Sequence, residues 1–208
     1  MSLSQELHRG TQALGLVLPE GAEAKLLEYL ALLSKWNRTY NLTAVRDEGE
    51  MVSHHLLDSL AVLSHLGDID TLADVGSGAG LPGLVLAIVK PGLNVTSVEA
   101  SQKKTAFQQQ AKMALQLDNV SIHCGRAELY NSHVAFASVI SRAFSSLTEF
   151  IRLAGKLVCS GGTLLAMKGQ LPEQEIAKLP ADWKVADAIR LDVPGLAAER
   201  HLIVMKRV

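Results

Sequence analysis

Four glycines within eight residues form the stretch of this chain best suited to do chemistry. Residues 72–83 read Leu-Ala-Asp-Val-Gly-Ser-Gly-Ala-Gly-Leu-Pro-Gly, and the apolar segment 84–89 follows. This order predicts a strand that leads through a tight turn into a helix. Glycine permits positive φ and close approach of a ligand, so the N–H groups around Gly76, Gly78 and Gly80 are expected to bind one. A tight turn without a ligand is the alternative, and so many glycines argue against it.

The acidic residue before the turn separates two classes of ligand. A Gly-x-Gly-x-x-Gly match begins at Gly78 and suits a dinucleotide. Counted from Gly76, however, the third position of that fingerprint is Leu81, where close helix–strand packing requires Gly or Ala. Asp74 would repel a pyrophosphate and attract an ammonium group. Because S-adenosylmethionine carries an ammonium and no phosphate, the turn is predicted to bind this methyl donor.

Charged residues follow several of the predicted strands, at the sheet edge where ligands of α/β proteins gather. Glu99 ends the second strand, where an acid accepts hydrogen bonds from both hydroxyls of a ribose. Glu128 follows the third strand, within Gly-Arg-Ala-Glu, and suits an adenine edge. Arg142 follows the fourth strand and Lys168 ends the fifth. Solvated surface acids are the alternative for Glu99 and Glu128.

A compact set of cationic, aromatic and amide side chains occupies residues 35–43, Lys-Trp-Asn-Arg-Thr-Tyr-Asn-Leu-Thr. In a structural role, Trp36 and Tyr40 close a helix onto the core while Asn37 and Asn41 cap it and turn the chain. In a functional role, the same groups stack on a nucleobase and hydrogen-bond to it. Chemistry alone favours the structural role.

Histidine and cysteine spacing predicts no metal site. His55 and Asp58 stand at i and i+3, close enough to interact on a helix, but such a pair without a third ligand usually packs. Cys124 and Cys159 form no CxxC pair, so neither a metal site nor a disulfide framework is expected.

Apolar periodicity divides the chain in two. Residues 1–68 are expected to form a small helical extension, and residues 69–208 an α/β domain with a seven-stranded, mostly parallel sheet that ends in an antiparallel hairpin. Helices are predicted at 4–14, 19–36, 48–66, 81–90, 101–117, 147–159 and 172–179. Strands are predicted at 71–75, 94–99, 119–124, 136–141, 162–168, 184–193 and 200–206.

Composition and charge describe an ordinary globular protein of 208 residues, with 48% hydrophobic and 20% charged residues. The sequence contains no apolar run long enough to span a membrane and no secretory pattern near Met1, so a cytoplasmic protein is expected. The net charge of −1 is uneven. Residues 1–70 hold five Lys and Arg against ten Asp and Glu, and residues 71–208 hold fifteen against eleven. Any RNA-binding surface must therefore be local.

Taken together, the motifs resemble the bacterial 16S ribosomal RNA guanine-N7 methyltransferases, the RsmG or GidB (glucose-inhibited division protein B) family. The resemblance runs over nearly the whole chain. It is carried by the glycine turn, by residues 35–43, by His-Leu-Leu-Asp-Ser at 55–59, by Ile-Ser-Arg-Ala-Phe at 140–144, by Lys-Gly-Gln at 168–170 and by Glu-Arg-His-Leu at 199–202. The glycine turn is common to many methyltransferases, whereas the other blocks make the match specific.

The resemblance implies a Rossmann-like methyltransferase fold with a small helical extension. It also implies methyl transfer from S-adenosylmethionine to N7 of one guanine in a decoding-region loop of 16S rRNA, as free RNA or in a small-subunit particle. No metal or membrane is expected to take part, and a monomer is expected. Cofactor contacts carry over to Gly76, Leu81, Ala127, Glu128 and Arg142. Glu99 stands where an aspartate is common.

Positioning roles near the reaction are assigned to Arg142, Asn41 and His55. Candidates for the RNA surface are cations and aromatics, since cations bind phosphates and aromatics stack on an extruded base. They are Lys35, Trp36, Arg38, Tyr40, Lys168 and Arg200.

Two other functions compete with methyl transfer. An NAD-dependent oxidoreductase has the same fold class, but Asp74 and Leu81 argue against it. A catalytically inert RNA- or ribosome-binding module with a degenerate turn is the other, and the intact glycines argue against that.

Overall fold

The computed structural model describes residues 2–131, 135–142 and 144–208. Ala143, in the Ser-Arg-Ala-Phe block, lies outside this set. Strands are β1 (Thr71–Val75), β2 (Asn94–Glu99), β3 (Val120–Cys124), β4 (Phe136–Ser141), β5 (Val158–Lys168), β6 (Trp183–Arg190) and β7 (His201–Arg207). Helices and helical turns are α1 (Leu3–Ala13), α2 (Ala22–Tyr40), α3 (Glu48–Met51), η1 (Val52–Leu57), α4 (Asp58–Leu60), η2 (Leu63–His65), α5 (Gly83–Val89), α6 (Gln102–Leu115), η3 (Ala127–Leu129), α7 (Leu147–Ala154), η4 (Gly155–Leu157) and α8 (Glu173–Ile176).

One sheet joins all seven strands of the described residues, in the order β3-β2-β1-β4-β5-β7-β6. The pairs from β3 through β5 are parallel, whereas β7 pairs antiparallel with both β5 and β6. The predicted α/β class and the mostly parallel sheet are confirmed, as is the antiparallel pairing of the last two strands. The seven observed strands follow the predicted ranges to within a few residues, except at the start of β5.

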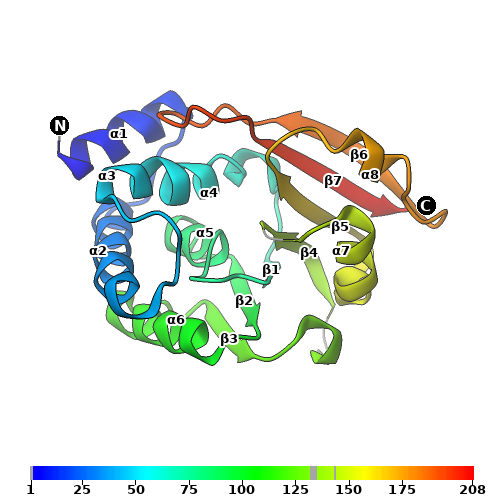
Figure 1. Ribbon diagram of the computed structural model, residues 1–208, viewed down its shortest axis with the longest axis horizontal. Helices are drawn as coiled ribbons and strands as arrows, with labels where there is room; N and C mark the ends of the chain where they lie inside the picture. The colour runs from blue at the N-terminus through cyan, green and yellow to red at the C-terminus, as the bar shows by residue number, and fades with distance from the viewer. Residues whose placement is uncertain (1, 132–134, 143) are drawn as a thin grey trace.

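Two hydrophobic cores cover the two faces of the sheet (Figure 1). Alternation along β1 explains the division, because Leu72 joins one core whereas Ala73 and Val75 join the other. The first core contains α5, α6 and the helices that precede β1. The second contains α7 and the ring of Trp183. Parallel strands buried on both faces account for the continuous apolar runs in the sequence.

The N-terminal helices pack on the α5–α6 side of the sheet (Figure 1). Helix α2 buries Leu26, Leu30 and Leu33, the apolar face that its helical spacing predicts. Helix α1 crosses η1 so closely that a Cβ on Gly10 would overlap the side chain of Leu57. The extension therefore shares a core with the sheet, and a domain boundary at residue 68 stays a prediction.

Three predicted helices differ in extent. The helix predicted at 48–66 is interrupted, because residues 52–57 are π-helical and residues 63–65 form a separate 3₁₀ turn. The helix predicted at 147–159 is α-helical only to Ala154 and continues as the 3₁₀ turn η4 to Leu157, because Val158 already pairs with Phe136 in the sheet. The helix predicted at 172–179 is reduced to residues 173–176.

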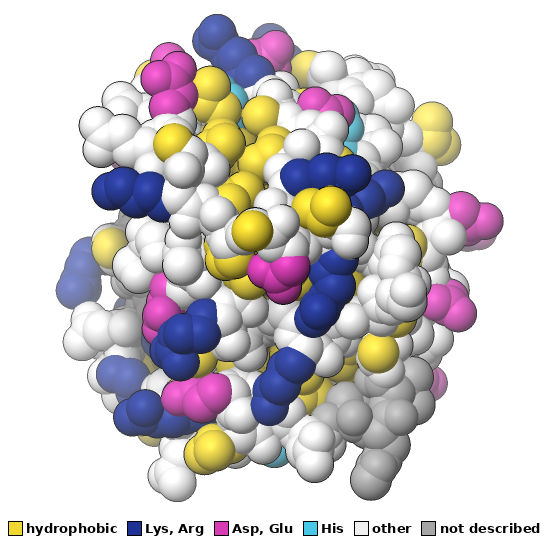
Figure 2. Space-filling model, turned by 90° about the vertical axis from the view of Figure 1, so that its right-hand side faces the viewer, with side chains coloured by type: hydrophobic (Ala, Val, Ile, Leu, Met, Phe, Trp, Pro, Cys, Tyr) yellow, Lys and Arg dark blue, Asp and Glu magenta, His cyan; other side chains and the backbone are white. Residues whose placement is uncertain are grey.

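Charge is mixed on the face that carries α7, α8 and the C-terminal end of the chain. Figure 2 shows Lys and Arg side chains there in separate groups, with Asp, Glu and apolar side chains between them. No single block of positive charge covers that part of the described surface. None of the described helices is both long and apolar enough to cross a membrane.

Candidate functional site

The carboxyl ends of the parallel strands meet at one edge of the sheet. Val75, at the end of β1, is in register with Val98 near the end of β2. Because β7 runs antiparallel to β5, Lys168 at the end of β5 pairs with His201 at the start of β7. The strand order reverses between β1 and β4, which is where open α/β sheets bind ligands. The glycine turn after β1 lies at this point.

Three glycines of the turn adopt the left-handed conformation that favours glycine. Their φ values are 69° at Gly76, 61° at Gly78 and 87° at Gly80. An added Cβ would meet no heavy atom within 4 Å at Gly76 or Gly78. Leu81 is buried in the core, and its N–H donates to the Ser77 carbonyl at 2.9 Å. The turn thus presents bare main chain to open space at its first two glycines.

Asp74, which was expected to meet the ammonium group of the ligand, lies beneath this turn. Its side chain is fully buried, and Oδ2 accepts a hydrogen bond from the Gly83 N–H at 2.7 Å. Oδ1 is buried without a hydrogen-bond partner among the described residues. Burial raises the pKa of Asp74 to about 7, the charge of Glu99 adds to this shift, and the Gly83 N–H and Arg142 oppose it. The site therefore lacks one donor for a buried carboxylate.

Glu99 links the end of β2 to the glycine turn. One carboxylate oxygen accepts a hydrogen bond from the Gly78 N–H and the other from the Ser101 N–H, both at 2.8 Å. The side chain is 8% exposed, so Glu99 is no freely solvated surface acid. Its carboxylate also lies at the strand end that the ribose assignment requires, and that assignment stays a prediction.

Ala127 and Glu128 lie in the turn η3 after β3. Ala127 is buried. The Glu128 side chain is exposed and lies 3.6 Å from the Arg126 guanidinium, while its carbonyl accepts a hydrogen bond from Lys156 Nζ. Glu128 is thus free to reorient toward a ligand at the rim of the sheet.

A cleft of about 380 Å³ opens beside the turn, between the N-terminal helices and the ends of β4, β5 and β7. Its lining is rich in titratable groups and consists of Val45, His54, His55, Asp58, Arg142, Met167, Lys168, Gly169 and Arg200. A larger hollow of about 570 Å³ lies along residues 190–199 beside α1, away from the glycine turn. The smaller cleft is the better candidate site because it lies where the strand ends converge.

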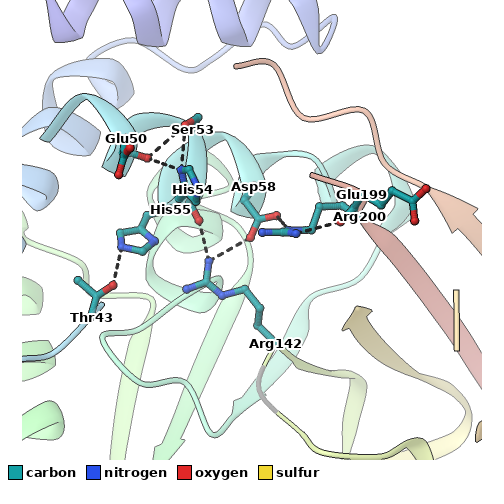
Figure 3. Close-up of polar contacts among 9 residues, drawn as sticks. All are labelled: Thr43, Glu50, Ser53, His54, His55, Asp58, Arg142, Glu199 and Arg200. Carbon is teal, nitrogen blue, oxygen red and sulfur yellow. Dashed lines mark hydrogen bonds and ion pairs between the residues drawn. The ribbon is translucent and has the colours of Figure 1, made fainter. Parts of the chain in front are cut away.

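Asp58 forms the centre of this cleft (Figure 3). Its carboxylate accepts a hydrogen bond from Arg142 Nη1 at 3.1 Å and another from Arg200 Nε at 2.9 Å. Arg142 Nη1 also donates to the His54 carbonyl at 3.1 Å. The expected pairing of His55 with Asp58 is thus replaced, because both oxygens of Asp58 bind arginines.

His55 lines the cleft, whereas Asn41 is not among its lining residues. His55 is buried, and its Nε2 lies 2.9 Å from the Thr43 hydroxyl, whereas its Nδ1 has no partner among the described residues. Burial, aided by the positive charge of Arg142, lowers the pKa of His55 to about 4. The ring is therefore neutral near pH 7. Asn41 is exposed, ends α2 with φ of 50°, and accepts a hydrogen bond from Arg46.

Most candidates for the RNA surface lie at the end of α2. Lys35 and Arg38 are exposed, and Arg38 lies 3.9 Å from Glu48. The Trp36 ring packs against Tyr40 and Phe107, with ring centroids 5.2 and 5.8 Å apart. Trp36 thus has the packing role that chemistry favoured, while 45% of Tyr40 stays exposed.

Lys168 is less available for contact with RNA than its motif suggested. Its side chain is 13% exposed, and Nζ binds the Glu175 carboxylate at 2.9 Å. Glu175 also accepts the Leu147 N–H at the beginning of α7. A contact between Lys168 and RNA would therefore compete with an ion pair that joins β5, α7 and α8. Among the described residues, no group of three or more His, Cys, Asp or Glu side chains could hold a metal ion.

Comparison with known proteins identifies the family. The family model described as GidB, rRNA small subunit methyltransferase G, matches residues 22–203. The chain belongs to this family. A relative from Aromatoleum aromaticum, named ribosomal RNA small subunit methyltransferase G, is 52% identical over 205 residues that cover 97% of each chain. A protein of the same name from Neisseria meningitidis serogroup C is 48% identical over 207 residues and covers all of both chains. The resemblance drawn from the motifs is confirmed.

Solved structures support the fold of this GidB family member. The O-methyltransferase TomG from Streptomyces achromogenes, crystallised with S-adenosylmethionine, superposes with a TM-score of 0.61 over 100% of this chain and 99% of that one. Sequence identity is 14%, so this likeness concerns the fold alone. The methyltransferase fold expected from the sequence is confirmed.

Sequence reasoning missed two residues that hold the glycine turn of this GidB family member. The hydroxyl of Tyr29, on α2, donates to the Ala79 carbonyl at 2.8 Å inside the core. Gln108, on α6, is fully buried and donates to the Gly78 carbonyl and the Ser77 hydroxyl, each at 2.8 Å. A polar residue on an apolar helix face was the available signal, because Gln108 falls on the buried side of α6 with Phe107.

Proposed function

We propose that this protein transfers a methyl group from S-adenosylmethionine to N7 of one guanine in a decoding-region loop of 16S ribosomal RNA. Membership of the rRNA small subunit methyltransferase G family supports the substrate class. The observation that carries the proposal is the glycine turn over Asp74, beside a cleft lined with arginines. We further propose that the protein acts as a monomer in the cytoplasm, on free rRNA or on a small-subunit particle.

The residues around the turn fit S-adenosylmethionine. Gly76 and Gly78 leave open space against the main chain, which admits a bulky ligand. The buried carboxylate of Asp74 beneath the turn, with Oδ1 unpartnered, favours a cationic group above it such as the ammonium of the methionine moiety. Glu99 would exchange its bonds to backbone N–H groups for the ribose hydroxyls, and Glu128 would turn toward the adenine. When bound, S-adenosylmethionine supplies a methyl group that the sulfonium already activates.

Guanine N7 needs no general base, because its lone pair is available and carries no proton. That lone pair forms the bond to the methyl carbon while the carbon–sulfur bond breaks and its electron pair stays on sulfur. The protein's contribution is to align the two reactants at about 3–3.5 Å and to exclude water. The reaction therefore calls for positioning groups, and a catalytic triad or metal is not required.

Positive charge near N7 opposes the reaction, because the product N7-methylguanine is cationic. His55 stays neutral near pH 7, since its pKa is lowered to about 4, and so adds no charge to the cleft. The carboxylate of Asp58 offsets part of the charge of Arg142 and Arg200. We assign these arginines to holding the cofactor and the RNA, and His55 and Asn41 to positioning.

A methyl-transfer assay tests the proposal directly. Purified protein is incubated with labelled S-adenosylmethionine and either 16S rRNA or small-subunit particles that lack the modification, and the methylated nucleotide is then mapped. We expect one N7-methylguanine in a decoding-region loop. Folded protein that labels neither substrate would count against the function. A thermal shift produced by NAD and not by S-adenosylhomocysteine would favour the oxidoreductase instead.

A further inference from the structure

Two arginines from distant parts of the chain share one buried carboxylate. Asp58, on α4, is 1% exposed. It accepts a hydrogen bond on Oδ2 from Arg142, at the end of β4, and one on Oδ1 from Arg200, at the start of β7. The N-terminal helices thus supply the group that holds two strand ends together.

The two guanidinium groups lie toward different parts of the site. Arg142 follows β4, which pairs with β1, so it lies at the strand end beside the glycine turn, and its positive charge opposes the rise in the pKa of Asp74. Arg200 lies on the other side of Asp58, where its Nη1 donates to the Glu199 carbonyl (Figure 3). About a quarter of each arginine side chain is exposed, 26% and 24% respectively. Each guanidinium therefore keeps donors that can meet a ligand.

Charge in the cleft is not balanced. Asp58 carries one negative charge for two arginines, and the Glu199 side chain points away from it in Figure 3. Lys168 has its own partner, Glu175. One positive charge is thus left over, and it can bind an anionic group of a ligand without breaking the bonds to Asp58.

We propose that Asp58 is a positioning residue that aligns Arg142, on the cofactor side, with Arg200, on the RNA side. A guanidinium donates in a fixed planar fork, so the carboxylate that holds one donor sets the direction of the others. Buried ion pairs add little net stability compared with apolar packing, which is consistent with a role in orientation. The proposal rests on the proposed function for its RNA side only.

The competing explanation is that Asp58 merely ties the extension to the sheet. In that case its loss lowers stability and the folded fraction, but each folded molecule works as before. A positioning role changes the turnover of folded molecules instead. A misplacement of about 1 Å in an aligned site costs up to roughly a hundredfold in rate. Turnover per folded molecule therefore separates the two roles.

The test compares the full-length wild type with Asp58→Asn, Asp58→Glu and Leu26→Ala. Asp58→Asn keeps the size of the side chain and removes its charge, whereas Asp58→Glu keeps the charge and moves it. Leu26 is buried in the core on α2 and is not part of the group formed by Asp58 and the two arginines, so Leu26→Ala is a control for lost stability alone. Each protein is assayed below its own unfolding transition for kcat, for KM with rRNA, and for the Kd of S-adenosylhomocysteine and of rRNA.

For Asp58→Asn we expect kcat per folded molecule to fall by about tenfold or more, and the Kd of S-adenosylhomocysteine to rise by about threefold or more. The Kd of rRNA should stay level or fall, because the cleft gains positive charge. Asp58→Glu should have a kcat between those of the wild type and Asp58→Asn. If Asp58→Asn does not fold, Asp58→Glu is compared with the wild type in its place. Leu26→Ala should keep the wild-type kcat per folded molecule.

The proposal would be overturned if folded Asp58→Asn kept the wild-type kcat. If only Asp58→Glu folds, a wild-type kcat in that variant would overturn it. So would an effect confined to the Kd of rRNA. Failure of the proposed function is separately visible, because it appears as absent methyl transfer in the wild type. The Kd of S-adenosylhomocysteine then still reports whether Asp58 orients Arg142.

Discussion

Asp74 couples the cofactor turn to pH. Its pKa is raised to about 7, chiefly by burial, so the carboxylate is partly protonated near neutrality. The positive charge of an ammonium bound at the turn would favour the ionised form of Asp74. This residue is therefore expected to make cofactor affinity depend on pH in a range where an ordinary aspartate has no effect.

We predict that the Kd of S-adenosylhomocysteine rises as pH falls below about 7, at a rate approaching tenfold per pH unit. Titration calorimetry between about pH 5.5 and 8 measures this slope. Asp74→Asn should bind more weakly at pH 8 and show a flatter profile. An unchanged slope in Asp74→Asn would assign the dependence to another group.

In the cofactor-free protein, the free energy of unfolding is expected to depend on pH in the opposite direction from cofactor affinity. A carboxyl whose folded pKa is raised contributes stability that is fully present below its unfolded pKa, 3.8, and is lost as pH rises through about 7. The stability of wild type relative to Asp74→Asn should therefore decrease from about pH 5 to pH 8 in urea unfolding. A constant difference between the two proteins would mean that Asp74 keeps the same charge throughout.

Glycine is required at position 83, beneath the turn, because there is no room for a Cβ, and not because of the φ angle. A Cβ at this position would lie 2.7 Å from Oδ2 of Asp74, which itself accepts the Gly83 N–H. We predict that Gly83→Ala lowers the free energy of unfolding by about 1–3 kcal/mol and weakens cofactor binding, because Asp74 must move. Gly92→Ala is the matched control, since an added Cβ there meets no atom within 4 Å. Equal stability of the two variants in urea would contradict this explanation.

At the scale of elements, α2 and α6 hold the glycine turn from behind. Tyr29 bonds to the Ala79 carbonyl, and Gln108 bonds to the Gly78 carbonyl. The turn therefore takes its shape from two helices that are remote in sequence as well as from its own glycines. Both helices also contribute apolar side chains to the core that contains α5.

We predict that Tyr29→Phe lowers the free energy of unfolding by about 1–3 kcal/mol, because the buried Ala79 carbonyl loses its donor. Cofactor affinity should fall with it, since Ala79 belongs to the turn. Tyr130→Phe is the control, because the Tyr130 hydroxyl has no hydrogen bond to any described residue. Urea unfolding and the Kd of S-adenosylhomocysteine provide the measurements, and identical behaviour of both variants would show that the bond is dispensable.

Local patterns predicted most of the elements, because strand alternation and helical spacing are properties of neighbouring residues. The strands and the glycine turn were predictable for this reason. The change from helix to strand at Val158 was not, since it depends on pairing with Phe136, which comes from another strand. The interruption of the helix at residues 48–66 also has no local signal.

The residues of the functional site were likewise predictable where they are defined by neighbouring residues, and not where they depend on distant ones. The turn and Glu99 could be found from sequence because the turn directly follows one predicted strand and Glu99 ends the next. The partners of Asp58 could not, because Arg142 and Arg200 come from separate strand ends. Likewise, the burial of Asp74 depends on how Gly83 packs over it.

On the scale of the whole molecule, the distribution of charged side chains argues against RNA binding over a broad surface. The net charge is −1, and residues 1–70 carry ten acidic side chains against five basic ones. The face in Figure 2 mixes both signs. Phosphate contacts must therefore come from a few side chains, among which the candidates are Arg200 in the cleft and the exposed Lys35 and Arg38 on α2.

We predict a shallow dependence of rRNA binding on salt. Each contact with a single-stranded phosphate contributes roughly −0.7 to the slope of log K against log salt, so three contacts give roughly −2. Arg38→Ala should make this slope shallower by about 0.7, because its exposed guanidinium would lose one phosphate. Lys184→Ala is the control. Lys184 is the second residue of β6 and pairs with Lys206 near the end of β7, whereas the cleft lies at the start of β7, so Lys184 is at the opposite edge of the sheet. Filter-binding titrations across salt concentrations provide the slopes. A steep wild-type slope that both substitutions reduce equally would mean that RNA binds over a wide surface, and that the cleft with its few neighbouring cations is only part of the interface.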